Sequence, residues 1–224
     1  MRIAIVGGHG KVALQLHPIL VRLGHTPVAL VRSEDYRAEL EGLGAEVRLL
    51  DIERQEAGDF AAAFDGCDAV VFSAGGGPDG NQERKQTVDL EGSLKSIQGA
   101  KEAGIRRFLQ VSAINVDEPL PTDTEPVWRA YVEAKRDADA ALRISDLDWT
   151  IIRPGTLTDG AGTGLVALGR DLTRGEIPRT DVATVLAISL DNDGTIGRQW
   201  DLIGGDTPIA DAIEAAVGRV GKRG

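Results

Sequence analysis

Along its first two-thirds, the chain alternates short apolar runs with segments whose apolar residues recur at helical spacing. An apolar run of about four to eight residues between turn residues is typical of a buried strand, whereas repeats at i, i+3 and i+4 are typical of an amphipathic helix. On this basis strands are predicted at 2–6, 27–32, 45–50, 68–74, 107–113 and 148–153. Helices are predicted at 12–23, from an N-cap at Ser33 to residue 43, and at 56–64, 82–103 and 126–144.

This alternation predicts an α/β fold, a Rossmann-type doubly wound parallel sheet with helices on both faces. Beyond residue 155 it loosens into a glycine-rich loop at 159–164, a helix at 180–190, a strand at 199–203 and a last helix from residue 208. We therefore expect one domain over residues 1–224, with a core at 1–155 and a small extension at 156–224 that is not an independent domain. Ligands of such sheets bind beyond the carboxyl ends of the strands.

The first predicted strand runs directly into a glycine cluster and then a helix. Gly7, Gly10 and Ala13 give the spacing G-x-x-G-x-x-A. Glycine at the first position permits a sharp turn, glycine at the second lets a pyrophosphate approach the backbone, and alanine at the third lets the helix pack closely on the sheet. The unpaired N–H groups and the dipole of the helix favour the same anion. By itself this spacing also fits an ordinary strand–turn–helix corner, but its position in a βαβ opening favours a dinucleotide site.

Composition excludes several other classes of protein. The 224 residues carry a net charge of −10, which argues against sequence-independent nucleic-acid binding. Cys67 is the single cysteine, and His17 and His25 offer no ligand pairing, so neither a disulfide framework nor a metal site is expected. No apolar run approaches the roughly 20 residues of a membrane span, and the first one ends at Val6, too early for a signal peptide. A cytoplasmic protein without a membrane partner is expected.

The end of the second predicted strand bears on the choice of dinucleotide. An NAD site usually ends this strand in Asp or Glu, which holds the ribose 2′-hydroxyl, but here the strand ends in Arg32. A guanidinium can hold a 2′-phosphate through two hydrogen bonds, with Ser33 as an additional donor, so NADP(H) is favoured over NAD(H). Asp51 and Ile52 end the third strand, where they would bracket an adenine; a plain turn or cap role for Asp51 is equally compatible.

A tyrosine and a lysine four residues apart suggest acid–base chemistry. Tyr131 and Lys135 would share one face of a helix. The ammonium, together with the positive charge of an oxidised nicotinamide, favours the phenolate and would bring the phenol toward acid–base work near neutrality. Ser112, at the end of the fifth strand, could hydrogen-bond a substrate carbonyl beside that phenol. Trp128, three residues before the tyrosine, is expected in the core, with the wall of a substrate cleft as the alternative.

Taken together, these motifs resemble the atypical short-chain dehydrogenase/reductases. The chain is similar to NAD(P)H-binding, NmrA-like proteins, to flavin/biliverdin reductase B and to bacterial NAD-dependent epimerase/dehydratase-like proteins. The resemblance extends over essentially the whole chain, and its carriers are the glycine cluster at 7–13, the strand ends at 31–32, 50–51, 73–75, 111–112 and 150–155, the pair at 88–89 and the helix at 131–135.

The resemblance implies roles for individual residues. Cofactor-binding roles fall on Gly7, His9, Gly10, Lys11 and Val12 at the pyrophosphate, Arg32 at the 2′-phosphate, Ala74 and Gly75 along the nicotinamide ribose, and Pro154 and Gly155 under the nicotinamide. Lys135 would bridge the ribose hydroxyls while Tyr131 works as acid/base, helped by Ser112. Asp89 stands where the family usually has Asn, so it either joins a proton relay or pairs with Lys135 and positions it.

The sequence leaves several functions open. The intact set of Ser112, Tyr131 and Lys135 favours an NADP(H)-dependent reductase of a small carbonyl, quinone or flavin-like acceptor. A non-catalytic NADP(H) sensor of the NmrA type keeps the fold without turnover. An epimerase or isomerase is disfavoured because about seventy residues after Gly155 leave little room for a substrate domain. The expected partner is a small-molecule substrate, either monomer or homodimer is compatible, and the loop at 159–164 is a candidate flap or plain surface loop.

Overall fold

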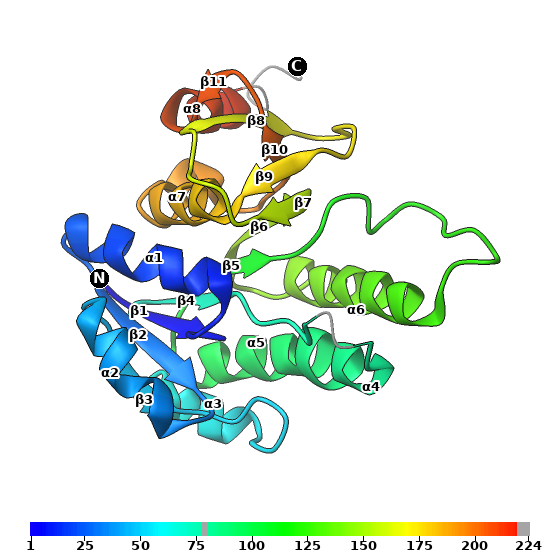
Figure 1. Ribbon diagram of the computed structural model, residues 1–224. Coiled ribbons are helices and arrows are strands. Elements are labelled where there is room, and N and C mark those ends of the chain that lie inside the picture. The colour runs from blue at the N-terminus through cyan, green and yellow to red at the C-terminus, as the bar shows by residue number, and fades with distance from the viewer. Residues whose placement is uncertain (78–79, 219–224) are drawn as a thin grey trace.

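The computed structural model describes residues 1–77 and 80–218, which form a nine-stranded sheet with helices on both faces, and a separate two-stranded sheet (Figure 1). The strands are β1 (Arg2–Val6), β2 (Thr26–Val31), β3 (Glu46–Leu49), β4 (Ala69–Phe72), β5 (Arg107–Val111), β6 (Asp148–Pro154), β7 (Thr156–Thr158), β8 (Leu165–Gly169), β9 (Glu176–Pro178), β10 (Arg198–Gly204) and β11 (Thr207–Pro208). The helices are α1 (Lys11–Arg22), η1 (Glu34–Tyr36), α2 (Arg37–Gly42), α3 (Ala57–Ala63), α4 (Gln82–Arg84), η2 (Lys85–Glu91), α5 (Gly92–Glu102), α6 (Pro126–Arg143), α7 (Arg179–Leu190), η3 (Asp193–Thr195) and α8 (Ile209–Gly218).

The large sheet has the order β11-β8-β10-β6-β5-β4-β1-β2-β3. Every pairing from β3 through to β10 is parallel, and β8 is antiparallel to both β10 and β11. The chain reverses direction across the sheet between β1 and β4, the switch point at which such folds bind ligands. The predicted Rossmann-type fold is therefore confirmed.

Two cores lie on opposite faces of the sheet because side chains alternate along each strand. Ile3 and Ile5 of β1 pack with α1 and α7, whereas Ala4 and Val6 pack on the other face with residues of α3 and α5. In Figure 1, α1 and α7 lie on one side of the sheet and α3, α5 and α6 on the other. All four residues of β4 are buried, which explains why a central strand reads as an unbroken apolar run.

The predicted elements up to residue 153 are all present, with ends that differ by one or two residues in most cases. The long helix predicted at 82–103 is continuous but contains the π-helical segment η2, a wider turn of the kind common at functional sites. The strands β7, β8, β9 and β11 were not predicted. They are two to five residues long, and glycine and loop residues separate them, so no periodicity marks them.

The residues after Gly155 extend the same sheet. β10 pairs with β6 in parallel, β8 adds to the far side of β10, and α8 packs on β8. The small sheet β7–β9 follows directly from the end of β6 and lies beside the beginning of α7. The segment therefore covers the carboxyl ends of β6 and β10, next to the predicted site.

Candidate functional site

A cleft of about 240 Å³ lies at the carboxyl ends of the strands on either side of the switch point. Its walls are the loop after β1 and the ends of β2, β3 and β4. The lining residues are Gly7, Gly8, His9, Gly10, Leu30, Val31, Arg32, Tyr36, Leu50, Asp51, Ile52, Glu53, Ser73, Ala74, Gly75, Arg84 and Val88. The cleft thus gathers eight of the predicted cofactor residues from four separate stretches of chain.

The glycine loop is shaped by close backbone approaches. Gly7 has φ of +80°, and a Cβ there would lie 2.8 Å from the Cα of Ala74. A Cβ on Gly8 would lie 2.8 Å from the Cα of Ala29. The N–H of Gly10 donates to the carbonyl of Gly7 at 2.8 Å. A side chain at Gly7 or Gly8 would collide with Ala74 or Ala29, so the observed path of the loop requires glycine at both positions.

The N-terminus of α1 carries neither a side-chain cap nor an acidic residue in its first turn. Its first N–H groups and the positive end of its dipole are therefore available to an anion at the mouth of the glycine loop. Val12 is buried in the core and can contribute only its backbone. Lys11 points elsewhere: its Nζ donates to Asp159 Oδ2 at 2.7 Å beside a second cavity of about 200 Å³.

Arg32 is exposed, lines the cleft, and forms no hydrogen bond or ion pair with any described residue. Its neighbour Ser33 is committed to the chain, as the predicted N-cap: its Oγ accepts from the N–H of Asp35 and donates to the Asp35 carboxylate at 2.8 Å. Of the two donors predicted for a 2′-phosphate, only the guanidinium is free to bind an external anion. The hydroxyl is occupied because the first turn of η1 needs a cap.

The opposite rim of the cleft is held by turn contacts. Asp51 Oδ1 accepts from the N–H of Glu53 at 3.1 Å, the cap geometry that was one of the two roles considered for it. Its side chain still lines the cleft beside Ile52. His9 does not point toward the glycine-loop amides: its ring stacks on Tyr36 with centroids 3.8 Å apart and lies 2.8 Å from Glu39 Oε2.

Sequence reasoning missed three polar or aromatic cleft residues, Tyr36, Glu53 and Arg84. Tyr36 lies four residues beyond Arg32, and Glu53 directly follows the predicted adenine pair, so their closeness to a strand end was the available signal. Arg84 had none, because only the fold brings α4 over the cleft, where the Nε of Arg84 lies 3.6 Å from Glu53 Oε2.

Lys135 lies deep at the other end of the site. Its Nζ lies 3.1 Å from Asp89 Oδ1, and it donates to the carbonyls of Ala74 at 3.3 Å and Val111 at 3.2 Å. These contacts match the three donors of an ammonium, so a ribose hydroxyl could bind only by displacing one of them. Burial, the largest single effect, would lower the pKa of Lys135, but the charge and hydrogen bond of Asp89, together with Tyr131 and Asp139, outweigh it and the pKa is raised.

Asp89 makes the pairing that the sequence offered as one of two roles. Its Oδ2 accepts from the N–H of Gly76 at 2.9 Å while Oδ1 faces Lys135. The residue lies in the π-helical segment η2 and is fully buried. The carboxylate therefore joins the ammonium to the glycine loop after β4, whose Ala74 and Gly75 line the cleft.

Tyr131 lies beside this ion pair, with Lys135 Nζ 6.0 Å from its ring centroid. Burial raises the pKa of Tyr131, and the ammonium of Lys135 only partly offsets that effect. The direction is opposite to the one predicted from the sequence, because the tertiary structure partly buries the tyrosine. The phenol of Tyr131 therefore keeps its proton at neutral pH.

Ser112 departs from its predicted role. Its Oγ is buried and donates to Asp139 Oδ2 at 2.8 Å, so its hydrogen is not available to a substrate carbonyl. Asp139 also accepts from Gln110 Nε2 at 2.7 Å and from the Nε of Arg153 at 2.8 Å. Burial raises the pKa of Asp139, opposed by these donors. Asp139 lies two helical turns beyond Tyr131, so the sequence places both residues on one face of the helix. It gives no sign that Asp139 would bind Ser112, Gln110 and Arg153.

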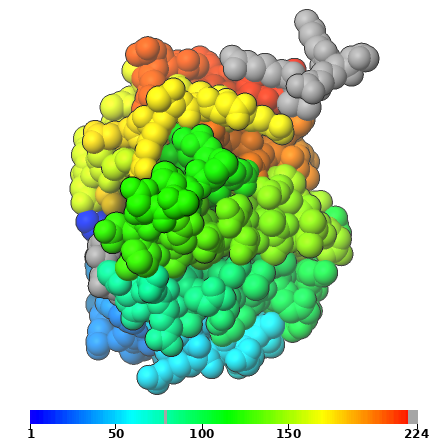
Figure 2. All heavy atoms as spheres, turned by 90° about the vertical axis from the view of Figure 1, so that its right-hand side faces the viewer, coloured from blue at the N-terminus to red at the C-terminus, as the bar shows by residue number. Residues whose placement is uncertain are grey.

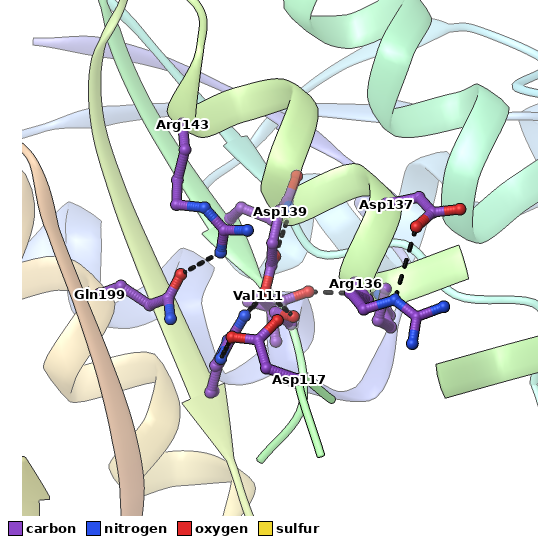
Figure 3. Close-up of polar contacts among 11 residues, drawn as sticks. Val111, Asp117, Arg136, Asp137, Asp139, Arg143 and Gln199 are labelled. Carbon is purple, nitrogen blue, oxygen red and sulfur yellow. Dashed lines mark hydrogen bonds and ion pairs between the residues drawn. The ribbon is translucent and has the colours of Figure 1, made fainter. Parts of the chain in front are cut away.

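Arg153 carries the network on toward the surface. Its Nη1 donates to Asp117 at 2.7 Å, in the connection that leads from β5 to α6. Figure 3 labels the two carboxylates that share this guanidinium, Asp139 on α6 and Asp117 on the connection. The guanidinium fixes the connection to β6, one strand away from the predicted serine.

Pro154 and Gly155 do not line the cleft that the structure forms. A Cβ on Gly155 would collide with the carbonyl oxygen of Gly175, which accepts from the N–H of Thr156 at 2.8 Å. Glycine is therefore required at position 155, because the chain entering β7 passes close to Gly175, the residue before β9. Its predicted place under a nicotinamide stays a prediction.

The candidate flap at 159–164 is bonded at both ends. Asp159 lies between Lys11 and Arg179, and the N–H groups of Thr163 and Gly164 donate to the Asp181 carboxylate at 2.9 and 3.0 Å. Within residues 1–77 and 80–218, no group of three or more His, Cys, Asp or Glu is arranged to hold a metal ion. Over the same residues, no helix is both long and apolar enough to cross a membrane.

Comparisons with known proteins agree with this geometry. A model of a protein family described as NAD(P)H-binding matches residues 7–193. The chain is 40% identical over 215 residues to the Bacillus subtilis (strain 168) protein named "Uncharacterized sugar epimerase YhfK", covering 96% of this chain and 99% of that protein. A solved structure titled a putative NAD-dependent epimerase/dehydratase from Bacillus halodurans has a TM-score of 0.89 and 40% identity, over 96% of this chain and 99% of that one. ChuY of Escherichia coli, titled an anaerobillin reductase, has a TM-score of 0.74 and 26% identity over 92% and 98%.

Proposed function

Because the chain belongs to the NAD(P)H-binding family, we propose that it is an NADP(H)-dependent reductase of a small carbonyl, quinone or flavin-like acceptor. The observation that carries the proposal is the contact between Lys135 and the carbonyl of Ala74. Through it, the cluster of Tyr131, Lys135 and Asp89 adjoins the wall of the cleft in which we place the dinucleotide. A proton donor and a dinucleotide site thus meet at one place.

The cleft suits a dinucleotide with an additional phosphate. The uncapped α1 and the loop from Gly7 to Gly10 would hold the pyrophosphate, and Arg32, which has no partner among the described residues, would hold the 2′-phosphate. Ala74 and Gly75 line the path between this end and Lys135. When bound, NADPH supplies a hydride.

The protein's own residues supply the proton. Tyr131 keeps its proton at neutral pH and gives it to the oxygen of the acceptor. The ammonium of Lys135, fixed by Asp89, stabilises the phenolate that remains until water reprotonates it. Ser112 can accept a hydrogen bond at this point but not donate one, because its hydrogen is held by Asp139.

The cofactor preference is tested by titrating the protein with NADPH and NADH and following nicotinamide fluorescence. Arg32→Ala should weaken NADPH binding about tenfold to a hundredfold and leave NADH binding unchanged, because a charge-assisted pair to the 2′-phosphate is lost. Arg22→Ala is the control. Arg22 is an exposed arginine in the last turn of α1, at the end of the helix that lies away from the cleft. Equal losses for both coenzymes would contradict the assignment of Arg32.

The reaction is tested by NADPH consumption over carbonyl, quinone and flavin acceptors. Tyr131→Phe should lower kcat on carbonyl acceptors by about a hundredfold or more while NADPH affinity and the unfolding midpoint stay the same. For a flavin-type acceptor we expect a smaller loss of kcat, since the reduced flavin can take its proton from water. Full carbonyl activity in the variant would remove Tyr131 from the mechanism.

The second candidate is a regulatory protein that binds NADP(H) without turnover. The bond from Ser112 to Asp139 favours it, because this hydroxyl is committed to the interior of the protein. Tight NADPH binding with no consumption of any acceptor would support it. The name of the Bacillus subtilis relative keeps an NAD(P)-dependent epimerase as a further candidate, which retention of tightly bound NADP+ through purification would favour.

A further inference from the structure

Three side chains from two separate elements form a column at the edge of the proposed active site. The guanidinium carbon of Arg174 lies 5.1 Å from the ring centroid of Trp128, whose ring lies 5.3 Å from that of Tyr131. Trp128 is 38% exposed, which corrects the expectation that it packs in the core, whereas Tyr131 is partly buried. The column therefore leads from solvent to the proposed proton donor.

Arg174 is held in place by the backbone on both sides of it. It belongs to the connection between β8 and β9, in which the N–H of Leu172 donates to Asp201 Oδ2 at 3.2 Å. On the other side the carbonyl of Gly175 accepts from Thr156 and lies against Gly155. Figure 2 shows the yellow segment that contains this connection lying over the bright green one that leads into α6. Because the β8–β9 connection is hydrogen-bonded on both sides of Arg174, the backbone of Arg174 is held beside Trp128.

Among the described residues, the guanidinium of Arg174 has no acidic partner. It forms no hydrogen bond or ion pair with any described residue, although the chain carries a net charge of −10. Arg129, at the same end of α6, differs: it donates to the carbonyl of Pro121 and lies 3.9 Å from Glu133. The positive charge of Arg174 also lowers the pKa of Tyr131 against the larger effect of burial, so it acts within electrostatic reach of the phenol.

We propose that Trp128 and Arg174 recognise the acceptor, and that this acceptor combines a flat ring system with an anionic group, a carboxylate or a phosphate. The exposed part of the indole offers an apolar contact for the ring system, and the guanidinium, which has no acidic partner among the described residues, offers two parallel donors for the anion. The inference rests on the proposed reductase and narrows its substrate to one class. Both residues are specificity determinants, whereas Tyr131 remains the proton donor.

The test compares riboflavin with flavin mononucleotide, which share one ring system and differ by a phosphate. Dissociation constants are measured by quenching of flavin fluorescence with the protein saturated in NADP+, which occupies the dinucleotide cleft and permits no turnover. The protein should bind flavin mononucleotide about tenfold more tightly than riboflavin, as one charge-assisted contact allows. Added salt should reduce the difference.

Variants locate the effect. Arg174→Gln should bind both flavins equally, Arg174→Lys should keep part of the preference, and Trp128→Leu should weaken both flavins alike. Arg170→Gln, an exposed arginine of the same β8–β9 connection without a partner among the described residues, is the matched control and should keep the tenfold preference.

Equal affinity for the two flavins, no measurable binding of either, or the same loss in the Arg170 variant as in the Arg174 variant would overturn the inference. NADPH consumption is measured separately. A phosphate preference that depends on Arg174 without any consumption would reject the reductase and keep the anion site. Consumption of NADPH with a neutral quinone, without any preference between the two flavins, would keep the reductase and reject the anion site.

Discussion

The two ends of the site differ in how many of their charged groups already have partners inside the protein. At the glycine-loop end, Arg32 is exposed and unpaired among the described residues, and α1 begins without a cap. At the other end Lys135, Ser112 and Asp139 are buried: Lys135 is paired with Asp89, and Ser112 donates to Asp139. One end is arranged to receive negative charge from a ligand, whereas the other compensates its own charges.

This difference determines what each residue can do. A free guanidinium acts alone, so its removal affects one ligand contact. Buried groups act together, because removing one leaves its partner unsatisfied in a place that water does not reach. The comparison therefore predicts large stability effects at the Lys135 end and mainly binding effects at the glycine loop.

The largest effect is expected from Asp139→Ala, which leaves Arg153, Gln110 and Ser112 without their shared acceptor. Loss of one member of a buried charge pair should lower the free energy of unfolding by about 3–5 kcal/mol. Urea denaturation measures it, with Asp137→Ala, an exposed position on the same helix, as the control. A loss no greater than that of the control would show that the network is not cooperative.

Asp89→Asn should be next, because it keeps a hydrogen bond to Lys135 but removes the main negative charge that opposes the effect of burial on the ammonium of Lys135. We expect a loss of about 2–3 kcal/mol at pH 7. In the native protein the raised pKa of Lys135 keeps its contribution intact at least up to its ordinary pKa. In the variant, burial would lower that pKa, so the penalty is present at low pH and relieved as the lysine deprotonates. The stability gap between the two proteins should therefore narrow from pH 7 to pH 10; a constant gap would contradict the ion pair.

Gly7→Ala tests the close approach at the glycine loop against Gly24→Ala. Both residues have φ near +80°, but a Cβ on Gly7 meets Ala74 at 2.8 Å while Gly24 has nothing within 4 Å. Backbone strain should cost both variants about 1 kcal/mol, and the collision should cost Gly7→Ala about 2 kcal/mol more. Thermal unfolding and NADPH titration measure the pair. Equal stability and equal affinity would mean that the loop relaxes freely.

The smallest effect is expected from Ser112→Ala. Asp139 keeps its bonds from Gln110 and Arg153, so the loss in unfolding free energy should be about 1 kcal/mol. Because the hydroxyl hydrogen faces Asp139, carbonyl reduction should fall far less than in Tyr131→Phe. A loss of kcat as large as that of the tyrosine variant would restore the serine to the predicted catalytic role.

Local pattern was sufficient where short-range physics decides the outcome. The strand–glycine–helix opening, the cap at Ser33 and the spacing of Tyr131 and Lys135 on one helical face follow from backbone conformation and helix period, and the structure contains all three. The missed strands after Gly155 are short, and their pairing partners are distant in sequence, so no local period could reveal them.

The sequence by itself determined the parallel sheet, the glycine-lined corner and the helical spacing of the candidate site residues, since hydrophobic period and turn residues act between neighbours. Only the tertiary structure decided which of those groups are engaged: it bonded Ser112 to Asp139, fixed Lys135 on Asp89 and left Arg32 without a partner among the described residues. It also reversed the expected shift in the pKa of Tyr131, because burial depends on everything that packs around a side chain.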